Sequence, residues 1–134
     1  MTHILLFCTA EEATKLVSEL MNVEKDKDYW QPYYLAESRH GPTEGKEFRE
    51  KLGEGETFAN DFIGASLDEC GAFELEQLKN SILDNRVVLL DARSAQDKTV
   101  TMGYYVNGGE AHMLAPGQKA REWYAFRVHY TKIL

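Results

Sequence analysis

The sequence predicts an α+β fold with a mixed sheet of about five strands, two or three helices and a C-terminal antiparallel meander. Three observations support this class. The densest apolar run, VVLL at residues 87–90, shows no alternation, as in a strand covered on both faces. Charged, helix-patterned segments precede this run. Two alternating segments follow it, at 99–106 and 122–132, and alternation is typical of half-buried antiparallel strands.

Length and composition indicate one folded unit. The chain has 134 residues, of which 43% are hydrophobic and 28% charged. These values are ordinary for a globular domain of common size. We therefore predict a single globular domain over residues 1–134.

The first two predicted elements are a strand followed directly by a helix, the beginning of a βα unit. Residues 3–8 (HILLFC) are a short apolar run that predicts a buried strand. Thr9 and Glu12 have the spacing of a capping box and predict a helix over 10–22. The aromatic segment 29–35 favours a strand. Because Pro32 cannot donate a ladder hydrogen bond, this segment is expected to be an edge strand or an extended loop.

The middle of the chain predicts helices. Pro42 and Gly53 suit the start and end of a short helix over 43–52. Ser66 opens a second capping box, and the clearest helical pattern covers about 73–83, with Gly71 as a weak point before it.

The second half predicts a meander. The run VVLLDARSA, residues 87–95, is expected to form the central strand. The strands at 99–106 and 122–132 follow, joined by a connection over 107–121 that is long for a hairpin. Alternation assigns one face of these two strands to the core. The residues expected on the other face are Thr101, Tyr105, Trp123, Arg127 and His129.

The net charge of −7 is concentrated in one segment. Eleven acidic and four basic residues lie between Glu44 and Asp84, and the rest of the chain is balanced. Nucleic acid is not expected to bind directly, because phosphates require a basic surface. Such a segment is either a solvated face or a surface that attracts a basic partner. The predicted contacts are Glu44, Glu47, Glu50, Glu54, Glu56 and Asp61.

The outer face of the C-terminal strands is a second candidate partner surface. Its Tyr105, Trp123, Arg127 and His129 include the residue types that dominate interface hot spots. The alternative is that one of the protein's own helices covers this face, in which case Trp123 should be fully buried.

A small-ligand or enzymatic site is the alternative function. Cys8 and Thr9 follow the first strand, and Asp91 and Arg93 follow the central one, so parallel pairing would bring them together. A helix start beside Cys8 would lower its thiol pKa. Otherwise, Cys8 is a core residue and Asp91 and Arg93 form an ordinary ion pair.

Metal and cofactor signatures are not found in the sequence. The four histidines lack ligand spacing, and Gly53-Glu54-Gly55 and Gly108-Gly109 lack the context of a phosphate-binding loop. Neither a metal nor a cofactor is therefore expected. Two cysteines make no disulfide framework, which favours reduced thiols and a cytoplasmic protein. No signal peptide or membrane-spanning segment is expected.

The profile is similar, in size and charge alone, to small bacterial immunity proteins and phage-type antagonists. This resemblance implies an inhibitor that neutralises a basic toxin or nucleic-acid enzyme. We therefore predict an acidic cytoplasmic binding protein and favour a non-enzymatic role. A homo-oligomer formed through the C-terminal sheet is a further alternative.

Overall fold

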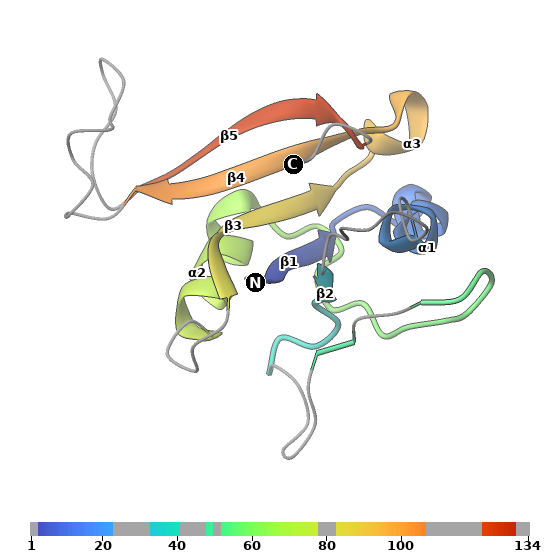
Figure 1. The fold of residues 1–134 in the computed structure, drawn as a ribbon, viewed down its shortest axis with the longest axis horizontal. Coiled ribbons are helices and arrows are strands. Elements are labelled where there is room, and N and C mark those ends of the chain that lie inside the picture. The colour runs from blue at the N-terminus through green and yellow to red at the C-terminus, as the bar shows by residue number, and fades with distance from the viewer. Residues whose placement is uncertain are drawn as a thin grey trace, which may run out of the picture.

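A five-stranded mixed sheet forms the centre of the structure, in the spatial order β2-β1-β3-β4-β5 (Figure 1). The computed structural model describes residues 3–22, 33–40, 48–49, 52–77, 83–106 and 122–130. β1 pairs in parallel with both β2 and β3, whereas β3, β4 and β5 form an antiparallel meander. This arrangement confirms the predicted α+β class. The strands are β1 (His3–Cys8), β2 (Tyr33–Leu35), β3 (Leu83–Leu90), β4 (Thr99–Val106) and β5 (Glu122–His129).

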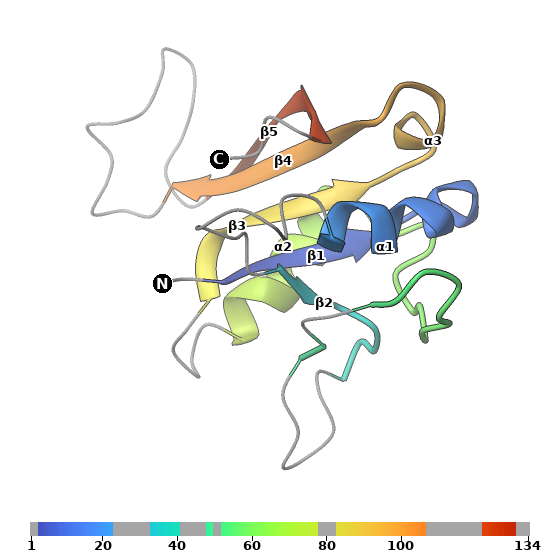
Figure 2. The same ribbon diagram turned by 45° about the vertical axis from the view of Figure 1, so that its right-hand side comes forward.

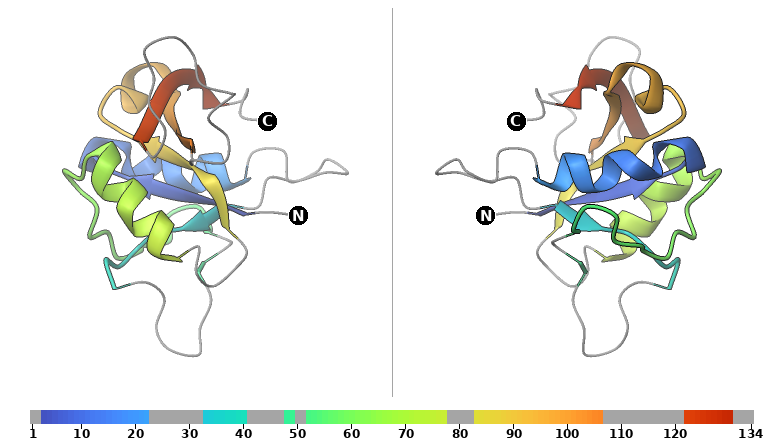
Figure 3. Two further views of the ribbon diagram at one scale, coloured as in Figure 1. Left: turned by 90° about the vertical axis from the view of Figure 1, so that its left-hand side faces the viewer. Right: turned by 90° about the vertical axis from the view of Figure 1, so that its right-hand side faces the viewer.

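Helices cover both faces of the sheet (Figure 3). The 3-10 turn η1 (Glu11–Ala13) leads into α1 (Thr14–Asn22) on one face, and α2 (Leu67–Gln77) lies on the other. A single turn, α3 (Ser94–Asp97), connects β3 to β4. Among the described residues, no helix is long and apolar enough to cross a membrane.

The apolar run of β3 contributes to two core layers. Val88 and Leu90 pack toward α1, while Val87 and Leu89 pack toward α2. All four side chains are at most 5% exposed, so the prediction of a strand buried on both faces is confirmed. Burying each such side chain stabilises the fold by about 2 kcal/mol.

The predicted limits of β3 are wrong. The strand covers Leu83–Leu90 rather than 87–95, so the predicted helix over 73–83 cannot extend to its end. The strand stops at Leu90 because the next residues close a turn. The amide of Asp91 donates to Ser94 Oγ at 3.0 Å, and the amide of Ser94 donates to Asp91 Oδ1 at 3.1 Å. These side chains bind backbone amides that would otherwise be available to continue the ladder.

The capping box at Ser66 is confirmed, but the helix begins earlier than its clearest pattern. The amide of Glu69 donates to Ser66 Oγ at 3.2 Å, and the amide of Ser66 donates to Glu69 Oε1 at 3.4 Å. The helix then starts at Leu67 and runs through Gly71.

Gly71 has a packing role. The indole of Trp123 lies so close that a Cβ at position 71 would be 2.2 Å from its Nε1 atom. Gly103 of β4 lies under the same helix, where a Cβ would be 2.6 Å from Leu67 Cδ1. Both glycines therefore allow α2 to approach the C-terminal strands closely.

Two other local predictions are wrong. Thr9 does not cap the first helix: its hydroxyl donates to the carbonyl of Leu90 at 3.3 Å, and Ala10 takes the N-cap position without a side-chain bond. In the predicted helix over 43–52, the residues that the structure describes are not helical, and Arg49 forms a β-bridge with Leu35. β-Pairing thus prevails over the helical signals there.

Strands β4 and β5, which we call the C-terminal ribbon, lie close to their predicted positions. β4 covers Thr99–Val106 as expected, while β5 ends at His129 rather than 132. The short β2 lies at the other end of the sheet, which confirms the prediction of an edge strand. The connection 107–121 lies outside the described residues.

Candidate functional site

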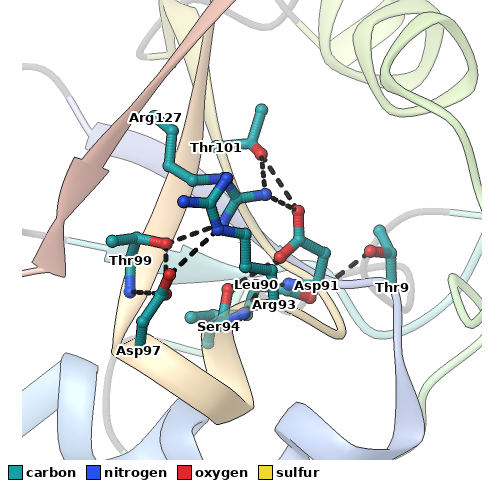
Figure 4. A network of polar contacts seen from close by, with 9 residues as sticks. All are labelled: Thr9, Leu90, Asp91, Arg93, Ser94, Asp97, Thr99, Thr101 and Arg127. Atoms are coloured by element: carbon teal, nitrogen blue, oxygen red, sulfur yellow. Dashed lines mark hydrogen bonds and ion pairs between the residues drawn. The ribbon is translucent and has the colours of Figure 1, made fainter.

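A polar network occupies the corner where β3 ends, on the α2 side of the sheet (Figure 4). Arg127 Nη2 of β5 makes an ion pair with the Asp91 carboxylate. The hydroxyl of Thr101 lies between them, donating to Asp91 Oδ2 and accepting from Arg127 Nη2, both at 3.1 Å. Ser94 Oγ donates to the other carboxylate oxygen at 3.1 Å. The β4–β5 register places Thr101 directly opposite Arg127.

A second carboxylate joins this network through another threonine. Arg127 Nη1 donates to Thr99 Oγ1 at 2.8 Å, and that hydroxyl donates to Asp97 Oδ1. Asp97 also accepts from Arg93 Nε at 2.9 Å. The predicted ion pair of Asp91 with Arg93 is therefore wrong. Arg93 lies one helical turn from Asp97, whereas the described arginine that reaches Asp91 comes from β5. We call Asp91, Ser94, Asp97, Thr99, Thr101 and Arg127 the Arg127 network.

The network keeps both carboxylates ionised. Burial alone would raise the pKa of Asp91, but hydrogen bonds from Arg127, Ser94 and Thr101 together hold it below the ordinary value. Hydrogen bonds from Thr99 and Arg93 lower the pKa of Asp97 to about 2. Donors and acceptors in the network thus satisfy each other. Such mutual satisfaction is typical of a structural ion pair.

The alternative ligand site is only partly assembled. Parallel pairing brings the ends of β1 and β3 together, and the amide of Thr9 donates to the Leu90 carbonyl at 2.8 Å. Cys8, however, lies in the core layer beneath α1, and its thiol donates to the Ala10 carbonyl at 3.2 Å. Burial raises the pKa of the Cys8 thiol, so at neutral pH it is protonated. Arg93 extends outward and is 64% exposed.

The outer face of the ribbon is largely occupied by internal contacts. Trp123 packs against the α2-side core, with Tyr105 beside it at a ring-centroid distance of 5.4 Å. Arg127 is held by its network. Trp123 is half-buried rather than fully buried, because α2 covers only its end of the face. His129, at the other end, is exposed.

The acidic segment presents a different surface. Glu44, Glu47 and Glu50 lie outside the described residues. Within the described part of this segment, residues 53–69 carry five acidic residues and no basic one, and we call them the acidic stretch. Its acidic residues are all exposed: Glu54, Glu56, Asp61, Asp68 and Glu69.

Two arginines from outside the acidic stretch hold three of its carboxylates. Arg49 binds Glu56. The Arg39 amide donates to Asp61 Oδ2 at 3.1 Å, and its guanidinium lies 3.3 Å from Glu69 Oε2. Glu54 and Asp68 have no hydrogen bond or ion pair to any described residue.

The acidic stretch is anchored to the sheet edge around one exposed apolar residue. Phe62 is buried, with its ring 4.8 Å from that of Phe7 and 5.1 Å from that of Phe73. The amide of Gly64 donates to the Thr9 carbonyl at 2.8 Å. Between these anchors, Ile63 is 44% exposed. Ile63 is not among the residues predicted from the sequence, although in a turn one member of the Phe62–Ile63 pair must face outward.

A hollow of about 490 Å³ adjoins the acidic stretch. It lies between α1 and the Gly53–Glu54 turn, and its lining is polar. Glu19, which also lines it, accepts hydrogen bonds from Lys98 and Tyr130. Among the described residues, no cluster of three or more histidine, cysteine or acidic side chains could hold a metal ion.

Comparison of the chain with protein-family models, with curated proteins and with solved structures finds no match.

Proposed function

We propose that the protein binds a basic protein partner through the acidic stretch and inhibits it, as an immunity or antagonist protein does. The observation that supports this most is the composition of the stretch, in which residues 53–69 contain five exposed carboxylates, no basic residue and the exposed Ile63. Arg39 and Arg49, from outside the stretch, bind three of these carboxylates, and Glu54 and Asp68 have no described partner. Carboxylates accelerate encounter with a basic protein, and an apolar side chain supplies contact area once the complex forms.

Anchoring of the acidic stretch lowers the cost of binding. The buried Phe62 and the bond from Gly64 to Thr9 fix the turn on either side of Ile63. Arg39 and Arg49 fix the directions of three carboxylates. A surface that is already ordered loses less conformational entropy on association than a mobile one.

The proposed compartment is the cytoplasm. Cys8 and Cys70 are both buried free thiols. Free thiols persist in a reducing compartment, which is where an inhibitor of an intracellular nuclease would act.

Binding of purified basic nucleases to the immobilised protein tests this proposal. At least one nuclease should bind at low salt, lose affinity as salt rises and lose activity in the complex. The double variant Glu54→Gln/Asp68→Asn should weaken association mainly through the on-rate, and Ile63→Asp should weaken it by about tenfold or more.

Glu76→Gln is the matched control, because Glu76 is exposed on α2 outside the acidic stretch. It should leave binding unchanged. If no nuclease forms a salt-sensitive complex, or if Glu76→Gln weakens the complex as much as the double variant does, the proposal is wrong.

A further inference from the structure

The two edges of the sheet are protected differently. β2 has three residues, and beyond it the Leu35 amide donates to the Arg49 carbonyl at 2.9 Å. β5 has eight residues in continuous register with β4 and contains neither proline nor lysine. No described strand pairs with its outer side. Natural edge strands are usually short, interrupted or charged, because unpaired backbone groups recruit another strand.

The middle of β5 is exposed on both faces of the sheet. Ala125 points to the α2 side and Phe126 to the α1 side, and both are exposed. Phe126, at 54%, is more exposed than Ile63, the other large exposed hydrophobic residue of the described chain. Its ring lies 6.3 Å from that of Tyr104, which in turn lies 6.0 Å from that of Tyr124. An aromatic row thus reaches the outermost strand of the described sheet.

The charge of this edge suits a second copy better than a basic partner. β4 has no charged residue, and β5 has one acid, Glu122, and one base, Arg127. The ribbon is therefore neutral in a chain of net charge −7. The turn at 53–65 lies at the opposite side of the molecule, beside β2 (Figure 1 and Figure 2). Two copies can therefore meet at β5 without bringing residues 53–65 of one copy against those of the other.

We infer that β5 is a dimerisation edge, at which β5 of a second copy of this chain pairs antiparallel about a two-fold axis through Ala125. In this register Ala125 lies opposite Ala125 of the other copy. Tyr124 of each copy lies opposite Phe126 of the other, so this pair occurs twice. Directly opposed residues of antiparallel strands point to the same face, so the pairing covers both Phe126 rings. It also places Glu122 of each copy opposite Val128 of the other, and Trp123 opposite Arg127. The two sheets become one, with an isologous interface.

The mass of the full chain as a function of concentration tests this inference. Light scattering or sedimentation equilibrium should show 15.3 kDa at low concentration, rising toward twice that value. Phe126→Lys should weaken the dimer by about tenfold or more, because it places a charge in the paired edge. Ile63→Lys introduces the same charge at the other exposed apolar residue and should leave dimerisation unchanged.

Cysteine cross-linking tests the register. Ala125→Cys should form a disulfide between copies on mild oxidation, since both native thiols are buried. Glu122→Cys should not, because the two copies of residue 122 lie at opposite ends of the pair. The inference is overturned by a monomer at every concentration, by a dimer insensitive to Phe126→Lys, or by cross-linking at 122 and not at 125. These assays need no partner, so they are independent of the proposed inhibitory function.

Discussion

The Arg127 network and the acidic stretch both combine carboxylates with arginines, but they direct these groups differently. In the network, one guanidinium and two threonine hydroxyls bind Asp91 and Asp97 between elements of the fold. In the acidic stretch, Arg39 and Arg49 bind carboxylates that remain exposed to solvent. Glu54 and Asp68 have no described partner. The first arrangement stabilises the protein, and the second leaves charge available to another molecule. The comparison teaches that the set of contacts a charged residue makes, rather than its type, decides whether its charge is neutralised within the fold or remains at the surface.

Arg127→Met is expected to have the largest effect on stability. It leaves Asp91 charged and partly buried without its cation. The loss should be about 2 kcal/mol, less than for a fully buried pair because the two side chains keep exposures of 24% and 28%. The urea midpoint measures this loss. Arg93→Met is the control, since its pair with Asp97 is solvent-exposed and should contribute little to stability. Equal losses in the two variants would contradict a structural role for the network.

Gly71→Ala tests how firmly α2 covers the outer face of the ribbon. In a solvent-exposed helix this change would stabilise by about 1 kcal/mol. Here the new methyl group meets the Trp123 indole, so we expect a loss of about 1–2 kcal/mol instead. In a double-mutant cycle with Trp123→Phe, part of the loss should be recovered. A stabilised Gly71→Ala variant would mean that the face is free for a partner.

Acid should abolish the difference in the free energy of unfolding between the wild type and Arg127→Met. Asp91 has a native pKa below its ordinary 3.8, so the unfolded chain takes up the proton first as the pH falls. The contribution of the pair is complete above about pH 4 and is lost as the pH falls through the native pKa. The urea midpoints of the two proteins should therefore approach each other as the pH is lowered from neutral to below 3.8. A difference in urea midpoint that does not change with pH would show that Arg127 acts through packing rather than charge.

Changes in the acidic stretch should have the smallest effects on stability. Glu54→Gln, Asp68→Asn and Ile63→Ser should each alter the free energy of unfolding by less than about 0.5 kcal/mol, because all three side chains are exposed. Thermal and urea unfolding measure this. A larger loss would place these residues in the architecture and weaken the case for a partner surface.

Periodicity predicted the fold class because it reports burial directly. The β3 run and the alternation over 99–106 each follow from which side chains face the core. The predicted boundaries of helices and strands were wrong where side chains compete for backbone groups, as at Asp91 and Ser94. The helix signals at 43–52 failed because pairing of Arg49 with Leu35 depends on a contact that is distant in sequence.

The candidate sites could be predicted only in part. The acidic segment is visible in the composition, and the proximity of Thr9 to Leu90 follows from parallel pairing. The partner of Asp91 was not predictable, because Arg127 is distant in sequence and reaches it only through the β4–β5 register. The role of Gly71 was hidden for the same reason, since Trp123 comes from another strand.

Each core layer contains one cysteine, and this gives the molecule two built-in reporters of opening. Cys8 lies in the α1-side layer and Cys70 in the α2-side layer. Burial and the nearby Glu69 raise the pKa of Cys70 to about 12, and burial raises that of Cys8. Neither thiol should react with an alkylating agent until its own layer separates from the sheet. Pulsed alkylation followed by mass spectrometry would therefore time the release of each helix separately and show whether the two halves of this core unfold together.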